Sequence, residues 1–179
     1  MDKMTITEAL AEVKLLLAKI AKKKEVVLVN VTRYSHVADP FIKDGGGKEM
    51  VRRELQAIRD LDIRLVRIRL AIARANLATK LTIGTVERTI TEWLAWRKEV
   101  ADGERSLLMA IAGNVNKTAK QAEQNPPAYK DETGKVKIAD LLYNVDADAI
   151  NLEAQGIDEV LGVLDGKLSL LNATTVVEF

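Results

Sequence analysis

The side chains that could catalyse a reaction are few, and the most suggestive of them lie in one short segment. The single histidine, His36, stands beside Ser35 and three residues before Asp39. A serine, a histidine and a carboxylate form the triad of many hydrolases, but there a rigid fold holds each of them in place. Near neighbours in a flexible loop do not provide that geometry, and the sequence contains no nucleophile elbow. We therefore interpret His36 as a solvated loop histidine.

A second segment superficially resembles a phosphate-binding loop. Gly45-Gly46-Gly47 is followed by Lys48, but a P-loop also needs an earlier glycine at fixed spacing and a buried strand before it. Both are missing from the sequence, so the glycines are better interpreted as a flexible hinge.

Acidic residues near the end of the chain resemble a calcium loop, namely Asp140, Asn144, Asp146 and Asp148. The glycine and the closing glutamate of such a loop do not fall into register. The carboxylates between Glu49 and Asp62 lack a Glu-x-x-His partner, and the chain has no cysteine. The sequence thus predicts no catalytic residue, no metal site and no cofactor, and we expect a protein that is not an enzyme.

The composition indicates which elements dominate. Of 179 residues, 30% are charged and 47% hydrophobic, but only 4% are aromatic, which favours long helices over a β-sandwich. No window approaches the roughly 18 uncharged apolar residues of a membrane-spanning helix. The first residues lack the apolar stretch of a signal peptide, so we expect the protein to stay in the cytoplasm where it is made.

The first helix is expected at about residues 5–33. Thr5 with Glu8 forms a capping box, and Leu10, Val13, Leu17 and Ile20 follow at helical spacing. Residues 26–31 are mostly β-branched and could form a strand, but the amphipathic pattern before them favours a continued helix. Residues 34–47 predict a mobile loop.

Two further helices are expected at about 48–79 and 85–124. In the first, apolar residues recur at steps of three and four, as in a coiled-coil seam: Val51, Leu55, Ile58, Leu61, Leu65, Ile68, Ile72 and Ala75. A similar seam follows Thr85, the expected N-cap: Val86, Ile90, Trp93, Arg97, Val100, Glu104, Leu107 and Ile111. Because few residues join these two helices, we expect them to form an antiparallel αα-hairpin.

Asn125-Pro126-Pro127 ends the third helix, and we expect a domain boundary here. Residues 1–125 would form the long-helix bundle, and residues 126–179 a connector, a small helix and a strand tail. Residues 136–138 are expected as a short strand or extended connector, and the helix at 147–171 is weakened by three glycines. The predicted fold class is mainly α: a long antiparallel coiled-coil-like helical hairpin or bundle with a small C-terminal helix and a short β-strand tail.

Several residues are candidates for an interface with another chain. Trp93 falls on the seam and is expected in the core, whereas Trp96 lies off it and is the better interface anchor. Arg97 and Glu104 occupy seam positions, where polar groups often fix register or partner number. In the β-prone tail, Val176, Val177 and Phe179 either add a strand to a neighbouring chain or fold back over their own helices.

Arginines recur along the second long helix at spacings that could follow a phosphate backbone, namely Arg52, Arg59, Arg64, Arg67 and Arg74. Arginines that flank an apolar seam also serve inter-helix salt bridges and solubility. No set of stacking aromatics accompanies them, and the net charge of the chain is only +1. We therefore expect no nucleic-acid binding and keep it as an alternative function.

Short motifs in four places resemble the septicolysin-like proteins, a bacterial group of helical proteins without an established activity. The motifs are Val37-Ala38-Asp39-Pro40, Ala75-Asn76-Leu77-Ala78-Thr79 with Gly84-Thr85, Ala95-Trp96-Arg97-Lys98, and Leu164-Asp165-Gly166-Lys167-Leu168 with Leu171-Asn172-Ala173-Thr174-Thr175. Their order and spacing match the family over most of the chain. Lys98 and Ala173 depart from its pattern, which has an acidic residue and often an aromatic there. The resemblance implies a helical fold but no site.

These patterns together predict a structural or assembly protein. We expect it to form a homo-oligomer, to join other proteins of a larger assembly and to span no membrane. The concrete setting that we expect is a phage virion. The alternatives are a cytoplasmic bacterial septicolysin-like protein of unknown activity and a nucleic-acid-binding protein that uses the arginine-rich helix.

Overall fold

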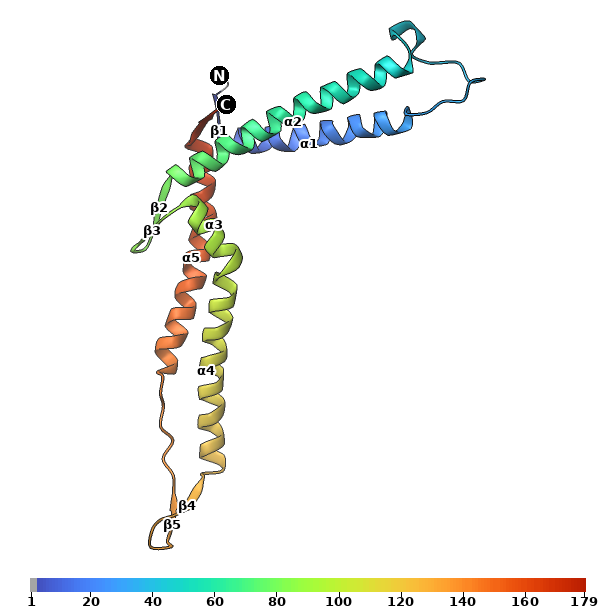
Figure 1. Ribbon diagram of the computed structural model, residues 1–179. Helices are drawn as coiled ribbons and strands as arrows, with labels where there is room; N and C mark the ends of the chain where they lie inside the picture. The colour runs from blue at the N-terminus through green and yellow to red at the C-terminus, as the bar shows by residue number, and fades with distance from the viewer. Residues whose placement is uncertain (1–2) are drawn as a thin grey trace. The chain divides into compact units, whose positions relative to one another are not determined.

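The structure is a computed structural model that describes residues 3–179 (Figure 1). It confirms the mainly α fold class, because five α-helices account for most of the described residues and the strands are short. Met1 and Asp2, the first residues of the expected bundle domain, lie outside the described residues. The described chain divides into two compact units, one formed by residues 3–80 with 167–179 and the other by residues 81–166.

Unit 1 is built on two long antiparallel helices, α1 (Ile6–Val29) and α2 (Gly47–Ala78), which lie side by side (Figure 1). Its core contains Ile6, Ala9, Val13 and Leu16 of α1 against Ile68, Ala71 and Ile72 of α2. A second cluster toward the loop joins Ile20 and Val27 to Ile58. The apolar seam predicted for the second helix is therefore the face that packs on α1. Two part-buried ion pairs, Lys23–Glu54 and Arg64–Glu12, border it.

The two ends of unit 1 are joined by a small sheet. Strand β1 (Lys3–Thr5) pairs antiparallel with β6 (Val176–Glu178), with Met4 opposite Val177. The predicted capping box is present, since the Thr5 hydroxyl accepts from the Glu8 amide and the Glu8 carboxylate accepts from the Thr5 amide. The strand thus turns directly into α1.

Unit 2 begins with a β-hairpin of β2 (Lys80–Ile83) and β3 (Val86–Thr89). Two consecutive helices follow, α3 (Ile90–Glu99) and α4 (Ala101–Gln124), and the unit ends with the part of α5 (Ala147–Thr174) that precedes Lys167. Helices α4 and α5 lie side by side and antiparallel (Figure 1), since Arg105 of α4 pairs with Asp158 of α5 at 2.7 Å, while Arg97 of the preceding α3 pairs with Asp165 further along α5.

A second hairpin stands between α4 and α5. Strands β4 (Ala128–Lys130) and β5 (Val136–Ile138) pair with Tyr129 opposite Lys137. The Asp131 carboxylate organises the turn, because it accepts from the amides of Thr133 and Lys135. Hydrogen bonds from the side chains of Thr133 and Lys137, together with those from these two amides, lower the pKa of Asp131. Of the two alternatives for residues 136–138, a short strand or an extended connector, the structure has the strand.

The expected third helix and the αα-hairpin are wrong. Residues 80–89 form the β2–β3 hairpin, whereas a helix was expected to begin at residue 85. Helix α2 packs on α1 and not on the helix that follows it. Thr85 lies in the hairpin turn beside Gly84, whose φ of 59° suits glycine. The residue that caps α3 is Thr89, whose capping box uses Glu92.

Other boundaries also differ from expectation. The first helix ends at Val29, before residue 33, and continues through residues 26–29 as expected. The chain divides at residues 80 and 166 and not at 125. The C-terminal helix has 28 residues and is not small. Its glycines weaken it, but Ala154, Ile157, Leu164 and Leu168 are buried at heptad spacing and hold it.

Candidate interaction surfaces

In unit 2, the β2–β3 hairpin positions a pair of tryptophans on α3. Trp93 is buried, and its indole Nε1 donates to the Leu81 carbonyl oxygen at 2.8 Å. Trp96, one turn later, packs edge-on against Trp93 with ring centroids 5.5 Å apart. The Arg88 guanidinium lies 4.8 Å from the Trp93 ring centroid and 5.7 Å from that of Trp96. The cation–π positions on these two rings are therefore occupied by the chain's own arginine.

A cavity of about 310 Å³ opens beside this pair. Its walls combine the tryptophans with Leu108 of α4, Ile157 of α5 and two carboxylates, Glu104 and Glu153. A mainly apolar lining with a few charged groups is suited to an inserted side chain or small apolar group. The cavity brings together Trp96 and Glu104, two of the residues that the sequence marked for an interface.

The sequence placed Arg97 and Glu104 on the seam of one continuous helix, and the structure has two helices there. Helix α3 ends at Glu99 and α4 begins at Ala101, with Val100 between them, so the apolar periodicity does not continue through this position. Glu104 and Leu107 are exposed, whereas Ala101 and Ala112 are buried. Arg97 forms an ion pair with Asp165 of α5 and is half-buried. Its partner lies in its own chain, and it does not reach the Trp96 cavity.

The C-terminal tail lies on unit 1 of its own chain. Val177 is 3% exposed and belongs to the α1–α2 core, and Phe179 packs against the same cluster. Val176, on the other face of the strand, is 56% exposed. Lys3 and Glu178 form an ion pair across β1 and β6, which raises the pKa of Lys3 and lowers that of Glu178. Of the two alternatives for the tail, the structure has the back-folded one.

The loop between α1 and α2 is organised by a carboxylate. Asp39 accepts from the amides of Phe41 and Gly47, each at 2.9 Å, and these bonds lower its pKa. Gly45 and Gly46 adopt positive φ, so they form a defined turn into α2. Because Asp39 already occupies the first amide of α2, the glycine run is an internally capped helix start. His36 is exposed and stacks on Tyr34.

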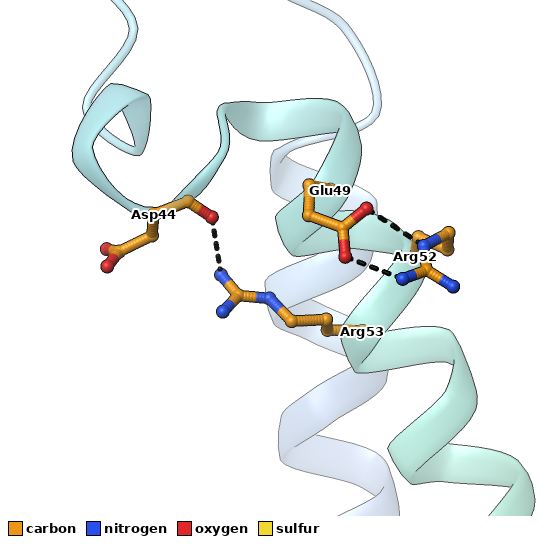
Figure 2. Close-up of polar contacts among 4 residues, drawn as sticks. All are labelled: Asp44, Glu49, Arg52 and Arg53. Carbon is orange, nitrogen blue, oxygen red and sulfur yellow. Dashed lines mark hydrogen bonds and ion pairs between the residues drawn. The ribbon is translucent and has the colours of Figure 1, made fainter.

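Two arginines of α2 are bound to groups at or just before the start of the helix (Figure 2). Arg52 forms two hydrogen bonds with Glu49, which raise the pKa of Arg52 and lower that of Glu49. Arg53 donates to the backbone carbonyl of Asp44 at 3.1 Å. Since the charge of Arg52 is already paired within a helical turn, it contributes little to a field that would attract phosphates.

The five arginines proposed for nucleic acid do not share one face. Arg64 turns toward α1, where it pairs with Glu12 at 3.2 Å and lies 5.6 Å from the Phe179 ring centroid. Arg59, Arg67 and Arg74 are exposed and lie on the side of α2 opposite the α1 contact. The predicted basic surface is therefore reduced to these three and the paired Arg52.

The sequence interpretation missed a second apolar seam on α2. It consists of Ile63, Val66, Leu70, Ala73 and Leu77, and we call it the outer seam. These positions repeat at steps of three and four on the face opposite α1. Ile63, Val66, Leu70 and Leu77 are 53%, 65%, 48% and 59% exposed. The three-four spacing of these apolar residues is visible in the sequence, but they alternate with arginines, and the segment was interpreted by its charges instead.

Two kinds of chemistry can be checked directly on the described residues. Between residues 3 and 179, no three His, Asp or Glu side chains are grouped so that they could hold a metal ion. None of the helices in that range has the length and apolar character that crossing a membrane requires.

Comparison with known proteins gives a fold relative without a function. No protein-family model matches the chain, and no curated protein matches it. A crystal structure described as a functionally unknown conserved protein from Corynebacterium diphtheriae has a similar fold, with a TM-score of 0.54 and 17% sequence identity. The similarity covers 99% of this chain and 100% of that one. At this identity the likeness concerns the fold alone.

Proposed function

We propose that this protein is a non-enzymatic assembly subunit that works as a homo-oligomer. The observation that carries the proposal is the composition of the buried surface of α4. In this helix of 24 residues the buried side chains are Ala101 and Ala112, while Leu107 and Met109 are exposed. A long amphipathic helix that fully buries only two alanines in its own chain, and leaves Leu108, Ile111 and Val115 half-buried, gains little from that packing.

The same situation holds in unit 1. Helix α2 packs on α1 with one face and leaves the outer seam in solvent. Two helices side by side can cover only one stripe of each other, so apolar side chains on the remaining faces need a further layer. Contiguous exposed apolar patches of this kind typically mark protein–protein contacts. A second copy of the chain is the simplest source of the missing layer.

The mass of the purified protein in solution tests this proposal. We expect light scattering at micromolar concentration to give a multiple of the 19.8 kDa chain mass. A homogeneous monomer at that concentration, with no partner added, would contradict the self-assembly proposal. If the mass is a multiple of the chain mass, sedimentation at several concentrations, from below micromolar upward, gives the number of copies and its concentration dependence.

Nucleic-acid binding is the competing function, and we expect it to be absent. Arg59, Arg67 and Arg74 are exposed, but they lie on or beside the face of the outer seam, and its aliphatic side chains give no stacking surface for bases. A gel-shift series with DNA and RNA checks this. A shift at physiological ionic strength that weakens steeply with salt, and that Arg64→Glu with Arg67→Glu and Arg74→Glu abolishes in a folded protein, would establish nucleic-acid binding instead.

The proposal does not depend on one biological setting. A phage virion would bring such subunits together at high local concentration, and so would a cytoplasmic oligomer of the septicolysin-like kind that the sequence motifs resemble. The Corynebacterium diphtheriae protein supports neither setting, because its description states no function. The genes that neighbour this one distinguish the two, since virion genes are clustered with other particle genes.

A further inference from the structure

We infer that the outer seam of α2 is the surface through which two copies of this chain associate, with the two α2 helices antiparallel. The inference rests on the proposed function and names the partner and the surface for it. It is carried by three features of α2: the heptad spacing of the outer seam, its exposure, and the charges on its two borders.

The seam has the form of a coiled-coil interface. Ile63, Leu70 and Leu77 stand seven residues apart, and Val66 and Ala73 alternate with them, which is the pattern of a and d positions. The α1 contact uses Leu61, Leu65, Ile68 and Ile72, on the opposite side of the helix. Helix α2 therefore has two apolar faces, and no element of unit 1 covers the second of them.

Acidic and basic residues border the seam in an order that suits an antiparallel copy. Asp60 and Arg67 lie on one border, and Asp62 and Arg69 on the other. When Ile63 of one copy packs against Val66 of the second, Asp60 lies beside Arg67 of the second copy and Asp62 beside Arg69. Two-fold symmetry repeats each pair, so all four charged positions meet an opposite charge.

A parallel arrangement satisfies fewer of these charges. There Asp62 would lie beside Arg67 of the second copy, but Arg69 would lie beside Arg74. Like charges at the border of a coiled coil oppose pairing and select against that orientation. In the antiparallel register Arg74 lies beside Arg53 of the second copy, away from the central layers, but four border contacts join opposite charges against two in the parallel arrangement. This difference decides the orientation that we infer.

The same register defines the contact of Arg59. This residue lies on the helix face of the outer seam, four residues before Ile63, and would lie opposite Leu70 of the second copy. The methylenes of an arginine can cover an apolar side chain while the guanidinium stays in water. The exposed arginines of α2, first interpreted as a phosphate-binding face, become the borders of a protein contact. Asp60 is already held on this face, since its carboxylate accepts from Gln56 at 2.9 Å.

Charge reversal with a complementary mixture tests the surface. Asp60→Arg with Asp62→Arg makes both borders basic, and Arg67→Asp with Arg69→Asp makes them acidic. Each variant alone should have half the mass of the unchanged protein, with helix content by circular dichroism unaffected because all four positions are exposed. An equimolar mixture should regain the original mass. Lys117→Asp with Lys120→Asp on α4 is the matched control and should keep it.

Cysteine cross-linking tests the orientation, since the chain contains no cysteine. A mixture of Ile63→Cys and Val66→Cys proteins should form a 63–66 disulfide between copies on oxidation, whereas Ile63→Cys alone should not cross-link. A 63–63 disulfide would overturn the antiparallel arrangement. If the charge variants keep the full mass, this inference fails while the assembly proposal stands. If the unchanged protein is a monomer, both fail.

Discussion

Replacing Trp93 by alanine should lower the free energy of unfolding of unit 2 by about 3–5 kcal/mol, the usual cost of truncating a large buried aromatic. Trp93 is among the largest fully buried side chains of the described residues and joins α3 to the β2–β3 hairpin. Its removal leaves a cavity, strips Arg88 of its closest ring contact and leaves the Leu81 carbonyl without its indole donor. We expect the hairpin and α3 to separate first.

Two further variants separate the contributions. Trp93→Phe keeps most of the apolar volume but loses the donor to the Leu81 carbonyl, so it should cost about 1–3 kcal/mol, less than the alanine variant. Trp96→Ala removes a half-buried ring and should cost clearly less than Trp93→Ala. Denaturant unfolding followed by fluorescence measures unit 2, because both tryptophans of the chain lie in it. Equal costs for Trp93→Ala and Trp96→Ala would contradict this account.

Local signals in the sequence were sufficient for much of the fold. Thr5 with Glu8 gave the start of α1, and the α2 seam gave a helix whose observed bounds, Gly47 and Ala78, lie within one residue of expectation. Both signals depend on residues within one or two turns of each other. The mainly α class follows from them without any knowledge of the helix partners.

The same kind of signal was present but misread near residue 85. Thr89 with Glu92 is a capping box, as clear as the one at Thr5, and before it Leu81 and Ile83 alternate with Lys80 and Thr82 up to Gly84. Treating residues 85–124 as one helix extends the apolar periodicity across the break at Val100. Glu104 is then assigned to a buried seam, although its side chain is exposed. A turn at Gly84 followed by a cap at Thr89 predicts the hairpin that is observed.

Helix pairing was beyond local reasoning. Helix α2 has two apolar faces, and nothing within the helix states that α1 covers one and leaves the other open. The pairing of Arg97 with Asp165 likewise joins residues 68 positions apart. For the candidate surfaces, the sequence found Trp96 and Glu104 but not their shared cavity, because its remaining walls come from β3 and α5.

Deleting residues 175–179 should destabilise unit 1 by about 3–5 kcal/mol and leave the oligomeric mass unchanged. The deletion removes strand β6, with its pairing to β1, and the Thr175 carbonyl that accepts from the Ile6 amide at 3.0 Å. It also removes Val177 and Phe179 from the α1–α2 core. Burying one such apolar side chain contributes roughly 1.5–3 kcal/mol. Thermal unfolding followed by circular dichroism, with light scattering on the same samples, measures both quantities.

Point variants in the tail distinguish this core role from an anchoring role. Val177→Ala removes methyl groups from the core and should lower the stability of unit 1, whereas Val176→Ala, on the exposed face of the same strand, should change it little. Both substitutions reduce β-propensity equally, so their difference reports burial alone. An anchor that adds a strand to another chain would behave differently. Truncation would then leave a stable protein of reduced mass, and that result would show that the tail holds two chains together.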